Sequence, residues 1–243
     1  MSDQLTFKNS KIQELRRLLR RRSSRSEAGA FVVEGAVLIT VAVSAGWTVV
    51  AEYIAPGAQP VSAAPVFELA EGVIERVAST ERPQPNLAVV TLPDRPIDLD
   101  TATFVVVADR LADPGNLGTI LRSAEAAGVD AVVLTPGSVD PFNPKVVRAA
   151  AGALFHVPVS VASLSHVRAA GLRMLGTSSH VGQRHTEVDW SGRIALVLGS
   201  EAHGLADDDA VDEWVRIEHQ GRAESINVAM AATVLVFAAA QAR

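Results

Sequence analysis

Residues 98–243 alternate between short apolar runs and segments with helical spacing, and this alternation is the strongest constraint on the fold. The helical segments lie near residues 116–128, 143–153, 163–170, 203–211 and 226–241. The candidate strands between them are TFVVVAD, AVVLTP, VPVSVA, RMLGTSS, RIALVLGS and WVRIEH. Apolar strands that alternate with helices indicate a parallel sheet covered on both faces. We therefore predict an α/β fold whose ligand sites lie in loops at the carboxyl ends of the strands.

The preceding residues predict a smaller α/β domain. Apolar spacing predicts a helix over residues 10–22, and AFVVEG and TVVAEYIAP are typical of strands on either side of a helix at 35–45. The composition changes in ERPQPNLAVVTLPDRPIDLD, where the prolines indicate a connector that contains the short strand LAVV. We place the boundary near residue 97, which gives domains of residues 1–97 and 98–243.

Cysteine usage and hydropathy exclude several classes of protein. The chain has no cysteine, which excludes disulfides, thiolate zinc sites and cysteine nucleophiles and is compatible with a cytoplasmic location. The apolar run over residues 35–56 is interrupted by Gly46 and Glu52. INVAMAATVLVFAAA has about 15 residues, fewer than the roughly 20 that span a bilayer. We interpret both runs as core segments and expect no membrane association.

Basic residues gather at the start of an otherwise acidic chain. The net charge is −5, yet residues 1–25 contain eight Lys or Arg and two acidic residues. A basic cluster on an acidic body indicates a local anionic partner, such as RNA. The alternative is a solvated helix end whose apolar residues Ile12, Leu15, Leu18 and Leu19 pack inward. The candidate RNA-binding residues are Arg16, Arg17, Arg20, Arg21 and Arg22.

The stretch ADPGNLGTILR, residues 112–122, leads from a strand into a helix. Asp113 or Asn116 is expected to cap this helix. Arg122 lies four residues after Gly118 on the same helix face, and helical side chains lean toward the N-terminus. Arg122 should therefore reach back toward Asn116, or else pair with the surface acid Glu125. The motifs GxxxxGK[ST] and GxGxxG are absent, so neither nucleotide-binding loop is predicted.

Two later loops also join a strand to a helix. In RIALVLGSEAHGL, Gly199 would let a ligand approach the backbone, and Glu201 after a buried strand needs a partner or solvent. His203 has no second histidine or cysteine at ligand spacing, so we expect no metal site. In ESINVAMAA, Ser225 is either the helix N-cap or a functional residue, and Asn227 follows it closely.

Together the three loops resemble the motifs of the SpoU (TrmH-like) RNA 2′-O-ribose methyltransferases. NLGTILR is similar to the first motif, LVLGSEAHGL to the second and ESINVAMAA to the third, and KVVRAAAGALFHVPV is similar to the segment that connects the first two. The resemblance covers residues 98–243. The first 95 residues resemble, less closely, the L30e-like RNA-binding domain that many members carry.

The resemblance implies a parallel α/β domain with a deep C-terminal trefoil knot, although knots are rare among protein folds. It also implies S-adenosylmethionine as the methyl donor and a homodimer with its active sites at the subunit interface. The implied catalytic residues are Asn116, Arg122, Glu201, Ser225 and Asn227, and the implied donor contacts are Thr177, Gly199, Ile217 and Ile226. One departure is Ile217-Glu218-His219, where the family usually has Ile-Pro-Met.

The resemblance implies methylation of a ribose 2′-hydroxyl in RNA, with ribosomal RNA as the expected substrate and transfer RNA as the alternative. A non-catalytic RNA-binding or ribosome-assembly protein is the competing class, and retention of the catalytic set argues against it. Arginine stays protonated in proteins. We therefore expect Arg122 to bind the RNA phosphate beside the target and orient the hydroxyl, rather than to act as a base. Glu201 and Asn116 would hold Arg122, while Ser225 and Asn227 would position the ribose and the loop.

Overall fold

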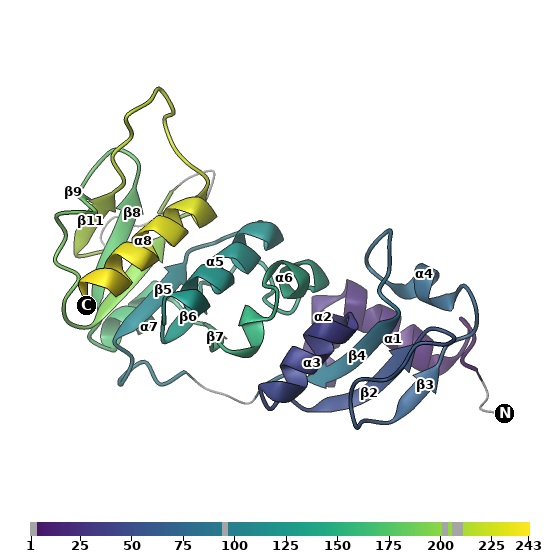
Figure 1. Ribbon diagram of the computed structural model, residues 1–243. Coiled ribbons are helices and arrows are strands. Elements are labelled where there is room, and N and C mark those ends of the chain that lie inside the picture. Colours follow the sequence, from purple (N-terminus) through teal and green to yellow (C-terminus); the bar gives the residue numbers. More distant parts are fainter. Residues whose placement is uncertain (1–3, 94–96, 201–203, 206–210) are drawn as a thin grey trace. The chain divides into compact units, whose positions relative to one another are not determined.

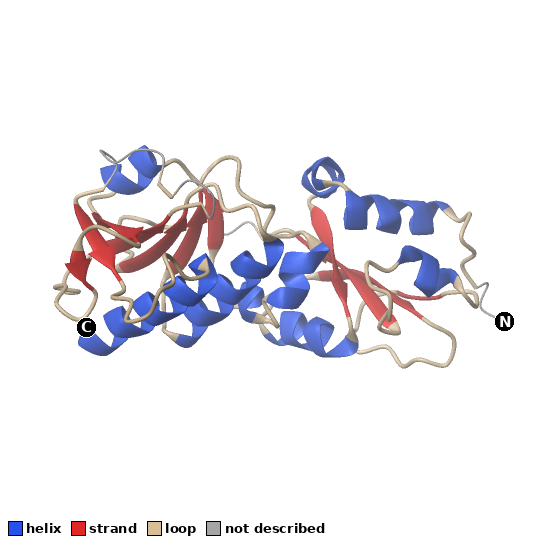
Figure 2. Ribbon diagram, turned by 90° about the horizontal axis from the view of Figure 1, so that it is seen from above, coloured by secondary structure: helices blue, strands red, loops and turns tan. Residues whose placement is uncertain are grey.

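The computed structural model describes residues 4–93, 97–200, 204–205 and 211–243 (Figure 1, Figure 2). The chain divides into two compact units. The first contains Met1–Asp94 and Asp140–Phe155, and the second contains Arg95–Val139 and His156–Arg243. The division near residue 95 lies close to the boundary placed from the sequence.

The first unit is built on a four-stranded sheet in the order β1-β4-β2-β3. β4 is antiparallel to both β1 and β2, and β3 is parallel to β2. The strands are β1 (Ala30–Glu34), β2 (Val49–Ile54), β3 (Val66–Glu68) and β4 (Asn86–Thr91). The helices within residues 4–93 are α1 (Ser10–Arg20), α2 (Arg22–Ala28), α3 (Ala36–Ser44) and α4 (Val73–Val77). Of these elements, the sequence analysis missed α2, β3 and α4.

Helix α1 packs on this sheet through the apolar residues expected from the sequence. Asn9 caps the helix, because its side chain accepts a hydrogen bond from the Lys11 backbone N–H. Four apolar residues are buried in the core with strand residues such as Val32 and Leu87. They are Ile12, Leu15, Leu18 and Leu19. The expected helix over residues 10–22 instead breaks at Arg21, and α2 begins at Arg22.

Residues 140–155 were assigned to the second domain from the sequence, but they pack with the first unit. This segment contains α6 (Pro144–Ala149) and the short 3-10 helix Ala153–Phe155. Arg25, buried in α2, donates through Nε to Asp140 Oδ2 at 2.8 Å. Phe142 and Phe155 join an aromatic cluster with Phe31 and Trp47. A buried ion pair and ring packing have no periodic signal, so strand–helix alternation did not predict them.

The second unit contains a seven-stranded sheet in the order β7-β6-β5-β10-β8-β11-β9, and every pair of neighbouring strands is parallel. This confirms the predicted parallel α/β fold. The six expected strands are β5 (Phe104–Ala108), β6 (Ala131–Leu134), β7 (Val159–Val161), β8 (Arg173–Ser178), β10 (Ile194–Leu198) and β11 (Glu213–Arg216). The two-residue edge strand β9 (Gln183–Arg184) was not predicted.

Helices cover both faces of this sheet. Figures 1 and 2 show α5 (Pro114–Ala126) and α8 (Val228–Ala242) side by side on one face, and α7 (Leu164–Ala169) on the other. Ser123 of α5 and Thr233 of α8 share a hydrogen bond of 2.6 Å between their hydroxyls. All residues of β5, β6 and β10 are buried, which is why these strands are continuous apolar runs. The helix expected over residues 203–211 lies mostly outside the described residues, and the trefoil knot stays a prediction.

In the described part of the chain, no helix is both long and apolar enough to cross a membrane.

Candidate active site

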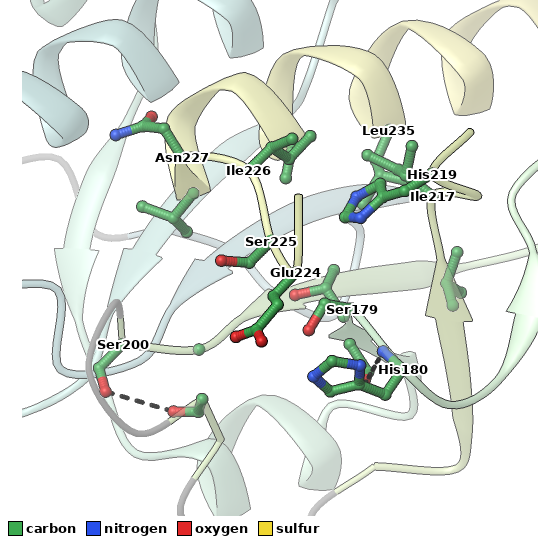
Figure 3. A pocket seen from close by; sticks show the side chains of 17 residues that line it. Ser179, His180, Ser200, Ile217, His219, Glu224, Ser225, Ile226, Asn227 and Leu235 are labelled. Atoms are coloured by element: carbon green, nitrogen blue, oxygen red, sulfur yellow. Dashed lines mark hydrogen bonds between the residues drawn. The ribbon is translucent and has the colours of Figure 1, made fainter. Parts of the chain in front are cut away.

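A cavity of about 500 Å³ lies where the carboxyl ends of β8, β10 and β11 meet the start of α8 (Figure 3). Parallel neighbours end at one edge of a sheet, so loops that are distant in sequence meet there. The walls combine hydroxyl, imidazole and carboxylate groups with apolar side chains. The lining comprises Thr177, Ser178, Ser179, His180, Gly199, Ser200, Gly204, Val215, Ile217, His219, Glu224, Ser225, Ile226, Asn227, Val228, Ala231 and Leu235.

The structure brings all four predicted donor contacts, Thr177, Gly199, Ile217 and Ile226, to this cavity. Two predicted catalytic residues, Ser225 and Asn227, also line it. Glu201 and His203 lie outside the described residues. Among the residues described, no cluster of three or more His, Asp or Glu side chains has the arrangement of a metal site.

Gly199 has a structural requirement for glycine in addition to its predicted contact with the donor. A Cβ atom on Gly199 would lie 2.3 Å from the Gly204 carbonyl carbon and 2.5 Å from the Leu205 nitrogen. The backbones of Ser200 and Gly204 also exchange two hydrogen bonds of 2.9 Å. The close approach that requires a glycine therefore comes from the protein's own backbone, and it shapes one wall of the cavity.

Asn227 caps α8, so the alternative that Ser225 is the N-cap is wrong. Asn227 Oδ1 accepts hydrogen bonds from the backbone N–H groups of Ala229 at 2.9 Å and Met230 at 3.2 Å. Ser225 is exposed before the helix, and its hydroxyl lies beside Glu224 in the cavity (Figure 3). The Asn227 amide points away from these two side chains (Figure 3).

The amide of Asn227 also joins α8 to the start of α5. Its Nδ2 donates to Asn116 Oδ1 at 2.9 Å. Asp113 is the N-cap of α5, since its Oδ1 accepts from the Asn116 N–H at 2.8 Å, and this settles the choice between Asp113 and Asn116. Asn116 therefore links the first and third motif loops, 111 residues apart in sequence.

Arg122 is exposed on α5 and does not line the cavity. Among the described residues, no acidic side chain forms an ion pair with Arg122, so the expected pairing with Glu125 is absent. No hydrogen bond joins Arg122 to Asn116 in the same part of the chain; the Asn116 side chain instead holds Asn227. Its guanidinium is therefore available to an anion from solution.

Eleven of the 17 cavity residues were not predicted as site residues, and several of them carry polar side chains that Figure 3 labels. Ser179, His180 and Glu224 gather near Ser225, whereas His219 lies with Ile217 and Leu235 (Figure 3). The carbonyl of Ala223 accepts a hydrogen bond of 3.2 Å from His219 Nδ1, which closes a turn within the loop between β11 and α8. The available signals were the position of Ser179 and His180 directly after an apolar strand, the departure of His219 from the family pattern, and the place of Glu224 at the start of the third motif.

The two residues that replace the usual Pro-Met of the family point to different partners. Glu218 forms an ion pair of 2.9 Å with Arg184 of β9. His219 lines the cavity. Where the chain departs from the family pattern, His219 therefore forms part of the cavity wall and Glu218 forms an ion pair at the sheet edge.

The predicted RNA-binding arginines lie in the first unit, on and after α1. Arg17, Arg20, Arg21 and Arg22 are exposed, whereas Arg16 is half-buried and stacks over the ring of Phe7 at 4.5 Å. Arg76 of α4 lies over the same ring at 3.8 Å. Within the described ranges, Arg16, Arg17, Arg20 and Arg21 form no ion pair with an acidic side chain.

Two family patterns match the chain, one in each unit. The pattern described as the SpoU rRNA Methylase family matches residues 103–237. The pattern described as the MRM3-like substrate binding domain matches residues 9–88. The second match falls where the sequence predicted a separate RNA-binding domain.

Relatives with similar sequences are ribosomal RNA methyltransferases. The chain is 34% identical to the 23S rRNA (guanosine(2553)-2′-O)-methyltransferase RlmP of Bacillus subtilis, over 95% of this chain and 96% of the relative. It is 30% identical to the 23S rRNA (uridine(2479)-2′-O)-methyltransferase of Streptomyces viridochromogenes, over 98% of this chain and 92% of the relative.

Solved structures show the same architecture. The SpoU methyltransferase AviRb from Streptomyces viridochromogenes, crystallised with AdoMet, superposes with a TM-score of 0.87 at 29% identity, over 96% of this chain and 98% of that one. The AdoMet-bound rRNA methyltransferase from Sinorhizobium meliloti gives a TM-score of 0.86 at 29% identity, over 99% and 98% of the two chains.

Proposed function

Because this chain belongs to the SpoU rRNA methylase family, we propose that it transfers the methyl group of S-adenosylmethionine to a ribose 2′-hydroxyl in 23S ribosomal RNA, in the cytoplasm. The observation that carries this proposal is the convergence of motif residues. Gly199 of the second motif and Ser225, Ile226 and Asn227 of the third line one cavity, and Asn116 of the first is bonded to Asn227.

The cavity fits the methyl donor in size and in chemistry. Its volume of about 500 Å³ is within the usual range of small-ligand sites. When bound, S-adenosylmethionine supplies an electrophilic methyl group on a sulfonium centre. Ile217, Ala231 and Leu235 provide apolar surface for a nucleoside, and the Ser179 hydroxyl and Glu224 carboxylate provide acceptors for cationic or donor groups. We propose that Thr177, Gly199, Ile217 and Ile226 contact the donor.

The chain's own residues position the acceptor. We assign Arg122 to a phosphate beside the target ribose, because its exposed guanidinium has no ion-pair partner among the described residues and a guanidinium can bind phosphate through two parallel hydrogen bonds. Ser225 would hydrogen-bond the ribose, while Asn116 and Asn227 hold the two loops together. Glu201, which lies outside the described residues, is proposed to complete this set. Positioning of this kind can supply several kcal/mol of a displacement barrier.

We propose that the first unit binds RNA through the exposed arginines of α1 and the turn after it. The apolar residues of α1 are buried, so removal of residues 1–25 would disrupt the core rather than test binding. Replacing Arg17, Arg20 and Arg21 by Gln keeps the buried face intact. The three substitutions should reduce the slope of log affinity against log salt concentration by about 2, if each arginine neutralises one phosphate. An unchanged slope would refute this surface.

We also propose a homodimer that forms through α8. Met230 is 64% exposed, and Val234 and Phe237 are exposed one and two turns later, which makes an apolar stripe on the helix surface. Ile226, exposed at the start of the same stripe, also lines the cavity. A second copy of this chain seated on the stripe would cover apolar surface and reach the edge of the donor site, so we choose it as the partner.

The function is tested in two measurements on the full chain. Calorimetric titration with S-adenosylmethionine should give saturable binding with one donor per chain. Incubation with radiolabelled donor and protein-free ribosomal RNA, purified from cells that lack the gene, should label 23S RNA at one ribose that resists alkaline cleavage. If only transfer RNA is labelled, transfer RNA rather than ribosomal RNA is the substrate. If the protein binds the donor but methylates neither RNA, the result favours the non-catalytic RNA-binding alternative.

A further inference from the structure

Arg110 adopts a backbone conformation that arginine disfavours. Its φ is +48°, and among the described residues only Arg110 and Ala151, with φ +49°, are non-glycine residues with positive φ. In this left-handed region the Cβ atom of an L-residue crowds the following carbonyl oxygen, whereas glycine carries no such cost. Such conformations persist where the surrounding structure imposes them, and they gather at binding sites.

A closed set of hydrogen bonds imposes this conformation. The Arg110 backbone N–H donates to Thr135 Oγ1 at 2.8 Å, and the Thr135 hydroxyl donates to Asp109 Oδ1 at 2.7 Å. Asp109 is buried, and its Oδ2 accepts from Arg110 Nε at 3.2 Å. Asp109 and Thr135 therefore fix both the backbone and the guanidinium of Arg110. They act as positioning residues for that side chain.

The loop that Arg110 begins connects β5 to α5, and hydrogen bonds join the residues on either side of it to segments that form the cavity wall. The Asp109 N–H donates to the Leu198 carbonyl at 2.8 Å, and the residue after Leu198 is Gly199, in the cavity wall. Asn116, in the first turn of α5 that follows this loop, is bonded to Asn227 in the same wall. Arg110 thus lies beside the cavity on the side of β5 and β6, at the edge where the sheet presents its carboxyl ends.

The guanidinium of Arg110 is held but still accessible. Its side chain is 42% exposed. The Nε atom of Arg110 donates a hydrogen bond to Asp109. Within the described residues, the two terminal amino groups of the guanidinium have no hydrogen-bond partner. A planar guanidinium with two outward amino groups matches the paired oxygens of a phosphate. A glycine would adopt this backbone conformation without strain. The presence of arginine here therefore indicates that its side chain has a role.

We propose that Arg110 binds a backbone phosphate of the substrate RNA that flanks the target nucleotide, as a second phosphate contact in addition to Arg122. This inference rests on the proposed RNA methyltransferase function. The RNA strand would then run along the carboxyl edge of the sheet, past α5 toward the ends of β5 and β6. The contact binds the backbone and carries no sequence information.

The test compares three variants of the full-length protein on protein-free ribosomal RNA at several salt concentrations. Arg110→Gly removes the guanidinium and relieves the backbone, Arg110→Lys keeps the positive charge, and Ala151→Gly is the control that relieves the same conformation elsewhere. Arg110→Gly should raise KM for RNA about tenfold, the value of one hydrogen bond to a charged group, and leave kcat near that of the unmodified protein. It should also reduce the salt dependence of log KM by about 0.7, the contribution of one single-strand phosphate.

The two other variants discriminate a phosphate contact from a structural role. Arg110→Lys should keep the salt dependence, and Ala151→Gly should leave both KM and the salt dependence unchanged. If Arg110→Gly raises KM without changing the salt dependence, Arg110 serves only to neutralise Asp109, and the inference is overturned. If Arg110→Gly fails to fold, Arg110→Gln gives the same salt-dependence test with the backbone strain retained.

The outcomes separate this inference from the function on which it rests. If the unmodified protein binds the donor but methylates no RNA, both are overturned. If it methylates RNA and Arg110→Gly behaves identically at every salt concentration, only the phosphate contact is overturned. In all variants, calorimetric affinity for S-adenosylmethionine should match that of the unmodified protein, because Arg110 does not line the donor cavity.

Discussion

At the scale of single residues, Gly199 is a position where one methyl group should disrupt the donor site. Its Cβ would sit 2.3 Å from the Gly204 carbonyl carbon, a backbone atom that cannot move aside as a flexible side chain can. We expect Gly199→Ala to lower the free energy of unfolding by about 1–3 kcal/mol, as overpacking usually does. The affinity for S-adenosylmethionine should fall at least tenfold by calorimetry, since a displaced loop removes one cavity wall.

Gly221 provides the matched control for this prediction. It lies in the loop before the third motif, has no positive φ, and a Cβ there would meet nothing within 4 Å. Gly221→Ala should therefore leave both unfolding and donor affinity unchanged. Donor affinity in Gly199→Ala equal to that of the unmodified protein would show that the packing of Gly199 against Gly204 and Leu205 does not shape the donor site.

Arg122 should be sensitive even to a change that preserves its charge. Lysine lacks the planar fork that binds phosphate through two parallel hydrogen bonds, so Arg122→Lys should lower kcat/KM for RNA about a hundredfold through misplacement of the acceptor. Affinity for S-adenosylmethionine should not change. The control is Arg168→Lys on α7, where the arginine forms an ion pair with Asp212 at the surface. Near-normal turnover of Arg122→Lys would contradict a bidentate positioning role.

At the scale of elements, Asn227 both caps α8 and bonds α8 to α5, and two substitutions can separate these roles. Asn227→Asp keeps an oxygen acceptor for the first N–H groups of α8 but loses the amide donor to Asn116, whereas Asn227→Ala loses both. We expect Asn227→Ala to destabilise the protein by about 1 kcal/mol, the usual value of an N-cap, and Asn227→Asp to destabilise it less. Both variants should lose methyl transfer. Full activity of Asn227→Asp would mean that the α5–α8 junction is not needed for catalysis.

The start of β5 depends on a carboxylate that precedes β6. Burial raises the pKa of Asp130, but hydrogen bonds from the N–H groups of Phe104 and Thr103 outweigh it and hold the pKa below the ordinary 3.8. A lowered folded pKa contributes stability that is present above the ordinary value and is lost as the pH falls through the folded one. The difference in unfolding free energy between the unmodified protein and Asp130→Asn should therefore be constant above about pH 5 and shrink below about pH 4. A difference independent of pH down to about pH 2 would contradict this assignment.

At the scale of the whole molecule, the apolar stripe on α8 predicts the oligomeric state. Met230→Glu places a charge in the middle of the proposed dimer interface and should convert dimers to monomers in sedimentation analysis, because a buried unpaired charge is costly. Methyl transfer should fall with it. Val37→Glu, on α3 and 77% exposed, is the matched control and should leave the dimer intact. A monomeric unmodified protein would refute the dimer.

Sequence patterns predicted the repetitive parts of the fold well. All six strands expected in the second unit are present, because strands buried on both faces must be continuously apolar. The edge strands β3 and β9 are short and partly exposed, so no comparable pattern marks them. Residues 140–155 were placed in the wrong unit, because Asp140 and Phe155 meet their partners Arg25 and Trp47 only in the folded chain.

The candidate site shows the same division between local and distant information. The family resemblance implied Thr177, Gly199, Ile217 and Ile226 as donor contacts, and the structure places all four in the wall of one cavity. The sequence could not decide whether Ser225 or Asn227 caps α8, because serine and asparagine are both favoured at the N-cap position. The structure shows that the helical backbone begins after Asn227, which is therefore the cap. The strained Arg110 had no sequence signal, since its conformation is imposed by Asp109 and by Thr135, 25 residues away.

The sequence by itself determined the α/β class, the parallel strands and the three motif loops. Strands buried on both faces and strand-to-helix turns produce local sequence patterns that can be recognised without the structure. Only the tertiary structure decided which loop atoms meet. The cavity wall at Gly199, the Asn116–Asn227 bond, the aromatic packing of residues 140–155 and the held guanidinium of Arg110 all join distant segments. Contacts of this kind depend on where the whole sheet brings its strand ends, and no local stretch of chain encodes that.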